Sequence, residues 1–157
     1  MQIRAATSSD VPSITACACE AYVHYIERIG KRPGPMLEDY DETLRTSQVH
    51  VAVEEDSVVG LIVLQRTPEG FFIDNVAVRP TQKGRGVGKQ LLLFAESEAL
   101  RQGYESIYLS THELMTENQA LYQRIGYVPF AHRVVGGYPR VFMRKPLAAV
   151  DTRASQR

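Results

Sequence analysis

A chain of 157 residues has the length of one compact domain, and its 44% hydrophobic and 23% charged residues are typical of a globular protein. Lysine plus arginine and aspartate plus glutamate both number 18, so the formal net charge is zero, which argues against a uniformly basic nucleic-acid-binding surface. The first six residues lack the apolar run of a secretory signal, and no stretch of about 18 apolar residues is present. We therefore expect a cytoplasmic protein that binds neither nucleic acid nor membrane.

The first half of the chain contains the signals of both strands and helices. Thr7 to Asp10 supply side chains that start helices, and apolar residues at helical spacing continue to Ile29, before Gly30 to Pro35 end the helix. The apolar runs that follow are separated by short, turn-rich segments, which favour an antiparallel meander. We expect a strand over 2–6, helices over 11–29 and 36–46, and strands over 49–54, 58–66 and 71–79.

The second half predicts two helices, each ended by a glycine, and three further strands. Residues 148–157 show no apolar period and are expected to form a disordered tail, which leaves one domain over 1–147. The order of elements predicts a mixed α/β fold with an antiparallel first half and a crossover helix in the second. The expected helices cover 87–102 and 116–125, and the expected strands cover 105–110, 127–135 and 138–145.

The segment from Lys83 to Gly88, Lys-Gly-Arg-Gly-Val-Gly, follows a strand and begins a helix. Its glycines remove Cβ atoms, so consecutive backbone N–H groups can approach one ligand, and the helix N-terminus adds a partial positive charge. Lys83, Arg85 and Lys89 place full positive charges nearby. A plain turn would explain one glycine but not this combination, which predicts a site for a pyrophosphate.

Spacing separates this loop from two other phosphate-binding motifs. A Walker loop continues from Gly-Lys to a serine or threonine that binds magnesium, whereas Gln90 follows Gly88 and Lys89 here. A Rossmann fingerprint needs its third glycine three residues after Gly86, and that position is a lysine. The nucleoside-triphosphate and dinucleotide interpretations are therefore excluded. Cys17 and Cys19 offer too few ligands for a metal site, and we expect no metal.

Two blocks of sequence resemble the GNAT superfamily of acetyl-CoA-dependent N-acetyltransferases. The family signature, Arg/Gln-x-x-Gly-x-Gly/Ala after a strand that ends in Val-x-Pro, is similar to Val78-Arg79-Pro80 followed by Lys83 to Gly88. The family's Leu-Tyr-x-x-x-Gly-Phe/Tyr block is similar to residues 121–127. The resemblance covers 2–146 and implies a GNAT-like acyl-CoA N-acyltransferase fold of class α/β (α+β), with a mixed, mostly antiparallel sheet of six to seven strands and about four helices.

The resemblance also implies acetyl-CoA as the cosubstrate. One strand should pair its backbone with the pantetheine, as an added strand would, and the amides of the glycine loop should cradle the pyrophosphate. Tyr122 should lie near the sulfur, with Asn118 four residues before it. The implied cofactor-binding residues are Val76, Ala77, Val78, Lys83, Gly84, Arg85, Gly86, Val87, Gly88, Lys89, Asn118 and Tyr122.

The implied reaction is direct attack of an amine on the thioester, without an acyl-enzyme. Tyr122 is the expected general acid, because a phenol with an unperturbed pKa near 10 stays protonated at neutral pH and can donate to a thiolate. Asp74, a carboxylate midway along an apolar strand, is the first candidate for the base, directly or through a water, since burial would raise its pKa. An exposed charge or a structural hydrogen bond is an alternative interpretation of Asp74, and His112 and Glu113 are alternative bases.

The acceptor site is expected, by analogy with the family, where the first two helices and the last hairpin meet the cofactor cleft. A small-molecule amine is the favoured acceptor, a peptide or protein amine is the alternative, and a catalytically idle acyl-CoA-binding module is a hypothesis of a different class. The expected partners are acetyl-CoA and the amine, and a homodimer through the last strands stays open. Candidate substrate-binding residues, for which packing roles are equally good explanations, are Tyr22, Tyr25, Arg28 and Tyr138, with Glu38 and Arg140 as further candidates.

Overall fold

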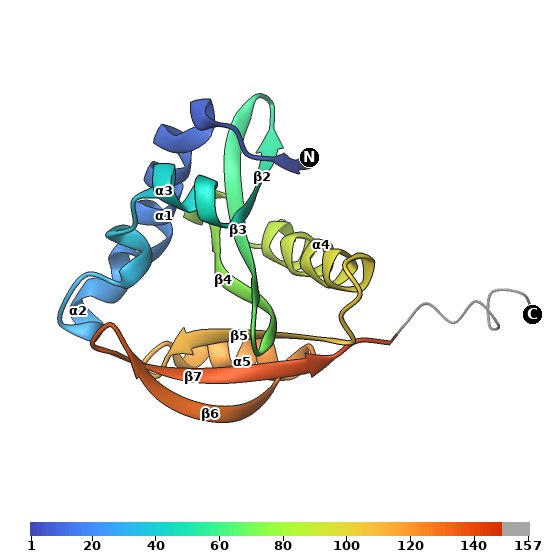
Figure 1. Ribbon diagram of the computed structural model, residues 1–157. Helices are drawn as coiled ribbons and strands as arrows, with labels where there is room; N and C mark the ends of the chain where they lie inside the picture. The colour runs from blue at the N-terminus through green and yellow to red at the C-terminus, as the bar shows by residue number, and fades with distance from the viewer. Residues whose placement is uncertain (149–157) are drawn as a thin grey trace, which may run out of the picture.

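The computed structural model describes residues 1–148, in which seven strands form one mixed sheet with the order β1-β2-β3-β4-β5-β7-β6 (Figure 1). All neighbouring strands are antiparallel except β4 and β5, which confirms the mostly antiparallel sheet expected from the sequence. The expected tail lies, from residue 149 onward, outside the described residues. The strands are β1 (Gln2–Ala5), β2 (Gln48–Glu54), β3 (Ser57–Thr67), β4 (Gly70–Val78), β5 (Ser106–His112), β6 (Val128–Val135) and β7 (Tyr138–Pro146).

The helices follow the expected order, with two differences at their boundaries. A 3-10 turn over Val23–Tyr25 separates α1 from the short α2, where one continuous helix was expected. The next helix begins at Tyr40 and not at Met36, because the Asp39 side chain accepts hydrogen bonds from the first-turn amides and so caps it there. The helices are α1 (Val11–Tyr22), α2 (Ile26–Ile29), α3 (Tyr40–Thr46), α4 (Val87–Arg101) and α5 (Thr116–Arg124).

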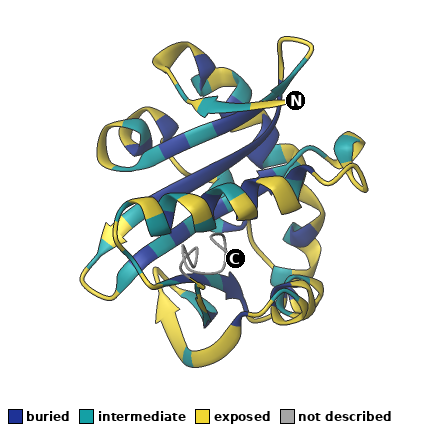
Figure 2. Ribbon diagram, turned by 90° about the vertical axis from the view of Figure 1, so that its right-hand side faces the viewer, coloured by how far each residue is buried: buried dark blue, intermediate teal, exposed yellow. Residues whose placement is uncertain are grey.

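Helices cover both faces of the sheet, so the core has two layers. On one face, apolar side chains of α4 and α5 pack against Ile62, Leu64 and Phe71. On the other, α1 and α3 pack against Leu61 and Val63. The inner strand β3 is therefore buried on both sides, as its nearly continuous apolar sequence requires. The α4 helix presents an exposed face to solvent (Figure 2). In the described part of the chain, no helix has both the length and the apolar character needed to cross a bilayer.

A β-bulge interrupts β4 at Asp74. Ile73 pairs with Leu64 of β3 and Asn75 pairs with Val63, so Asp74 is an extra residue with no partner in the register. The bulge also reverses the alternation of side chains, because Ile73 faces the α4 layer whereas Asn75 reaches side chains of the α1 and α3 layer. The strand expected over 71–79 is present, but the direction of its side chains changes at the two adjacent polar residues, Asp74 and Asn75.

Candidate active site

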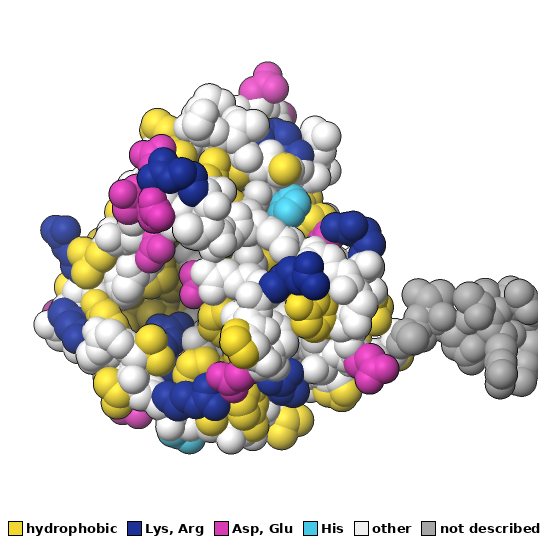
Figure 3. Space-filling view, viewed as in Figure 1, with side chains coloured by type: hydrophobic (Ala, Val, Ile, Leu, Met, Phe, Trp, Pro, Cys, Tyr) yellow, Lys and Arg dark blue, Asp and Glu magenta, His cyan; other side chains and the backbone are white. Residues whose placement is uncertain are grey.

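The strands β4 and β5 pair over only three residues each, from Phe71 with Ile107 to Ile73 with Leu109. Beyond that point they separate, as Figure 1 shows, and a cavity lies in the opening. The space-filling view is hollowed on this face of the molecule, with apolar side chains inside and charged side chains of both signs at its edge (Figure 3). Of the residues that the sequence predicted for the site, Tyr22, Asp74, Val76, Asn118, Tyr122 and Tyr138 line this cavity, together with Arg140.

The Asp74 carboxylate lines this cavity because the bulge of β4 directs it there. Burial raises the pKa of Asp74, the charge of Glu38 raises it further, and the guanidinium of Arg140 opposes the shift. A raised pKa makes a carboxylate a stronger base. The environment therefore suits Asp74 to accepting a proton, and its role as the base stays a prediction.

Tyr122 of α5 lines the same cavity. Its position is fixed by two contacts with Tyr127, which lies five residues further along the chain. The two rings meet edge to face with their centroids 5.8 Å apart, and the Tyr127 amide donates to the Tyr122 carbonyl at 2.9 Å after the helix ends. Burial raises the pKa of Tyr122 to about 12, so its hydroxyl stays protonated at neutral pH. Within residues 1–148 no side chain or backbone group hydrogen-bonds this hydroxyl, which leaves it available to a ligand.

A chain of hydrogen bonds, which the sequence did not predict, fixes the wall opposite Tyr122. The Tyr22 hydroxyl donates to Asn75 Oδ1 at 2.8 Å and lies 3.0 Å from the Val76 carbonyl. Asn75 Nδ2 donates to the Tyr40 hydroxyl at 3.2 Å, and that hydroxyl donates to the Pro35 carbonyl at 2.7 Å. The adjacent polar pair at 74–75 in an apolar strand was the one sequence signal that this strand departs from simple alternation.

The two alternative bases are placed less favourably than Asp74. His112 is buried and lines the cavity, but its Nδ1 accepts a hydrogen bond from the Leu114 amide at 3.1 Å, and burial lowers its pKa. The neutral ring therefore carries its proton on Nε2 and presents a donor there. Glu113 is exposed and does not line the cavity.

The glycine loop continues from the far end of β4 to the N-terminus of α4. Gly84 and Gly86 both have left-handed backbones, with φ of 84° and 78°, and a Cβ on either would meet no other atom within 4 Å. Among described residues, no acceptor pairs with the amides of Gly84 and Gly86 or with the three amides that open α4. Lys83, Arg85 and Lys89 are exposed and form no ion pair in this part of the chain. Free amides, open space and unpaired cations fit a pyrophosphate group.

The stretch of β4 from Asp74 to Val78 connects the cavity to this loop. From Asn75 onward its backbone pairs with β3 on one side. No strand pairs with its other edge, because β5 has already separated from it, and the Val76 carbonyl lies 3.0 Å from the Tyr22 hydroxyl. A free strand edge offers alternating N–H and C=O groups to an extended ligand. The cavity that Tyr122 lines reaches Val76 on β4, and two residues further along the same strand, after Val78, the chain continues toward the glycine loop.

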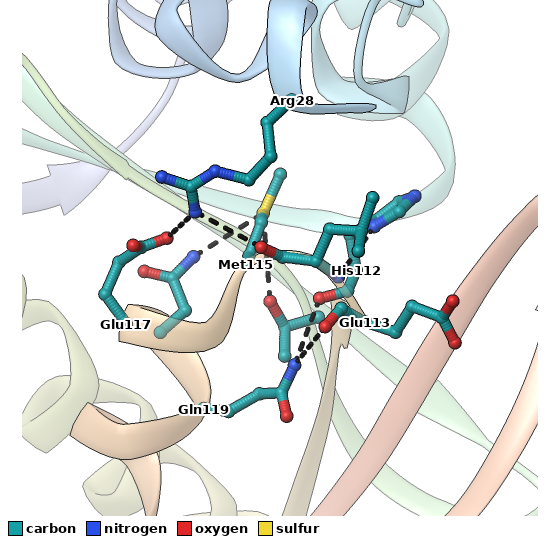
Figure 4. A network of polar contacts seen from close by, with 9 residues as sticks. Arg28, His112, Glu113, Met115, Glu117 and Gln119 are labelled. Atoms are coloured by element: carbon teal, nitrogen blue, oxygen red, sulfur yellow. Dashed lines mark hydrogen bonds and ion pairs between the residues drawn. The ribbon is translucent and has the colours of Figure 1, made fainter. Parts of the chain in front are cut away.

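Tyr25 and Arg28 do not line the cavity, and Arg28 instead contacts the loop and helix that follow β5. Arg28 forms an ion pair with Glu117 at the start of α5 and donates to the Leu114 carbonyl at 3.2 Å (Figure 4). Its guanidinium also lies 5.1 Å from the centre of the Tyr25 ring. In the same network Gln119 donates to the Glu113 carbonyl at 2.8 Å, so the loop between β5 and α5 is held from both sides.

A second brace joins the segment after α2 to the turn between β6 and β7. The Lys31 ammonium donates to the Gly137 carbonyl at 3.1 Å and lies 4.0 Å from the centre of the Tyr138 ring. The Tyr138 hydroxyl donates to the Arg32 carbonyl. Together with Pro33 to Pro35, which line the cavity, these contacts form a roof over the end of the site that is remote from the glycine loop.

Comparisons with known proteins agree with this geometry. The Acetyltransferase (GNAT) family matches residues 16–127. An aminoalkylphosphonate N-acetyltransferase of Salmonella typhimurium is 30% identical over 134 residues, which cover 80% of this chain and 84% of that protein. An uncharacterized N-acetyltransferase of Bacillus subtilis, YvbK, is 32% identical over 94 residues, which cover 59% of this chain and 61% of that protein.

Solved structures show the same fold at lower identity. A GNAT family acetyltransferase from Elizabethkingia anophelis with acetyl-CoA bound is 20% identical, with a TM-score of 0.72 over 93% of this chain and 97% of that one. The order of strands, the parting of β4 and β5 and the family match define the class of protein. The chain belongs to the acetyltransferase (GNAT) family and is an acetyl-CoA-dependent N-acetyltransferase.

Proposed function

We propose that this enzyme transfers the acetyl group of acetyl-CoA to the primary amine of a small molecule by direct attack. The observation that carries the proposal is that a carboxylate with a raised pKa and a protonated phenol, Asp74 and Tyr122, line one cavity. The new C–N bond forms as the C–S bond breaks. Asp74 takes the amine proton, directly or through a water, and Tyr122 supplies a hydrogen bond and then a proton to the departing sulfur.

The residues that hold acetyl-CoA follow from the surface between the cavity and the glycine loop. The free edge of β4 at Val76 to Val78 pairs with the pantetheine, and Asn118 and Tyr122 lie at its sulfur end. The amides from Gly84 to Lys89 hold the pyrophosphate, with Lys83 and Arg85 as counter-charges. The unpaired amides and the open left-handed glycines are what supports this assignment.

A small acceptor is favoured over a peptide because the roof covers the acceptor end of the cavity. Contacts of Arg28 with Leu114 and of Lys31 with Gly137 close both sides of the segment that includes Pro33 to Pro35. A polypeptide would need an open groove along this path. The Salmonella relative, whose name specifies aminoalkylphosphonates, supports the same choice. In this proposal Tyr22 and Tyr138 contact the acceptor, and Tyr25 and Arg28 support them.

The test is a transfer assay with acetyl-CoA against a panel of small amines and peptides with free N-termini, read as thiol release and as acetylated product. Turnover on small amines with little on peptides is the expected result. Turnover on peptides alone would replace the proposed acceptor class. Tight CoA binding without transfer to any acceptor would favour the idle acyl-CoA-binding module.

A further inference from the structure

Arg140 of β7 places a guanidinium in the acceptor end of the cavity. Its Nε donates to Ser110 Oγ at 2.8 Å and its Nη2 donates to the Ser110 carbonyl at 3.1 Å. Both contacts are made to β5 just beyond the point where that strand leaves β4. The two hydrogen bonds hold the planar group in one orientation, with Nη1 left without a partner among the described residues.

This guanidinium forms no ion pair with any residue of 1–148. The ion pairs of the described chain do not include Arg140, so no carboxylate oxygen there, including those of Asp74, lies within 4.0 Å of its nitrogens. Burial lowers the pKa of Arg140, while the charge of Asp74 and the phenols of Tyr22 and Tyr122 raise it. Arg140 is half-buried, and charges that are removed from water are normally paired, so a guanidinium that faces a cavity without an ion pair indicates that the ligand brings the anion.

The anionic groups of acetyl-CoA do not supply the anion that would pair with Arg140. The site proposed for its pyrophosphate lies in the glycine loop, at the other end of the β4 edge, and no residue of that loop lines the cavity. The cavity itself contains one carboxylate, Asp74, and one guanidinium, Arg140. A molecule complementary to this pair carries one positive and one negative group. Figure 3 shows charged side chains of both signs at the edge of the hollow.

We propose, on the basis of the proposed function, that the acceptor is a small zwitterion whose acid group binds to Arg140 while its amine faces Asp74. The planar fork of an arginine matches a carboxylate or a phosphonate by paired hydrogen bonds, which a lysine cannot reproduce. Arg140 is thus the specificity-determining residue, and the transferable proton of the substrate ammonium leaves toward Asp74. Carboxylate and phosphonate share this chemistry and are separated by the assay.

The experiment compares kcat/KM for matched primary amines with two-carbon spacers that end in a carboxylate, a phosphonate, a hydroxyl or a methyl group. At least one acidic acceptor should exceed both neutral ones by about 30-fold or more, in line with loss of a charge-assisted hydrogen bond pair. Arg140→Gln should reduce that ratio to within about threefold of unity. Arg140→Lys should restore part of the preference, because it keeps the charge but not the fork.

Arg144→Gln is the matched control. Arg144 lies four residues further along β7, donates to Ser106 of β5 as Arg140 donates to Ser110, and does not line the cavity. Its replacement should keep the acidic preference. The midpoint of thermal unfolding and the Kd for CoA, measured for all three variants, separate a local loss from misfolding.

Two outcomes would overturn this inference but leave the proposed function standing. One is equal kcat/KM for neutral and acidic amines, and the other is a preference for acidic amines that survives Arg140→Gln in a folded protein. Acetylation of peptides alone would instead overturn the proposed function, and this inference with it. A folded Arg140→Gln variant that loses acetyl-CoA affinity but keeps the acidic preference would assign the guanidinium to the cosubstrate.

Discussion

Ile73 and Leu109 form the last parallel pair between β4 and β5, and the next residue on each strand, Asp74 and Ser110, already lines the cavity. The site is thus created by the end of a strand pairing. Because the chain continues past this point on both strands, one edge of β4 remains free to bind an extended ligand. The consequences can be tested residue by residue.

Replacing Tyr122 by phenylalanine should lower kcat by about 10- to 100-fold, toward the low end of general acid catalysis, because the pKa of Tyr122 near 12 makes it a weaker acid than a free phenol. Stability should change little, since the hydroxyl has no partner in the described chain. Tyr127→Phe is the control: its buried hydroxyl also lacks a partner but lies outside the cavity. Steady-state kinetics of both variants should show a loss only for the first, and equal kcat values would refute the acid assignment.

The acid limb of the kcat–pH profile should report Asp74. A base works only when deprotonated, and burial raises the pKa of Asp74, so kcat should fall as pH decreases through a value above that of an ordinary aspartate. Asp74→Asn should lower kcat by about 100-fold. Glu38→Gln removes a charge that raises this pKa and should move the limb to lower pH. A limb that does not move in Glu38→Gln would point to another group.

Gly86→Ala should separate backbone strain from ligand binding. An alanine at φ of 78° is strained by roughly 1 kcal/mol, and its Cβ would occupy the open space beside the loop that the pyrophosphate is proposed to fill. Gly103→Ala, at φ of 91° just past the other end of the α4 helix and equally free of neighbours, carries the same strain without that role. Denaturant unfolding should show similar losses for both, and calorimetry should show a CoA affinity at least 10-fold weaker only for Gly86→Ala. Equal CoA affinities would place the pyrophosphate elsewhere.

The ion pair between Arg4 and Asp10 should make stability depend on acid pH. Arg4 donates two hydrogen bonds to the Asp10 carboxylate, at 2.8 and 3.0 Å, and the guanidinium lowers the pKa of Asp10 to about 2. Because the folded pKa lies below the unfolded one, the stabilisation is complete above pH ~4 and is lost as pH falls toward 2. Asp10→Asn should cost about 1–2 kcal/mol at pH 7, after allowance for the half-exposed arginine, and much less at pH 2. Urea unfolding at both pH values measures the difference, and a pH-independent cost would contradict it.

Local patterns were sufficient for much of this enzyme. The order of strands and helices, the glycine loop before α4 and the tyrosine block on α5 are determined by residues close together in sequence, through periodicity, capping and backbone freedom. Family membership followed from two such blocks. Tyr122 and Asp74, the expected acid and base, line one cavity, and their catalytic roles stay predictions.

The contacts between segments that are far apart in the sequence were established only by the tertiary structure. The bulge that aims Asp74 depends on the register between β4 and β3, and the end of the β4–β5 pairing depends on where the crossover through α4 returns the chain. For the same reason Arg28, an expected substrate contact, is found paired with Glu117, and Arg140 lines the cavity without an ion pair among residues 1–148. The sequence by itself predicted the cofactor chemistry, because the proposed pyrophosphate site is one short loop. The cavity is lined by residues of α1, β4, β5, α5 and β7, and no local pattern records their meeting.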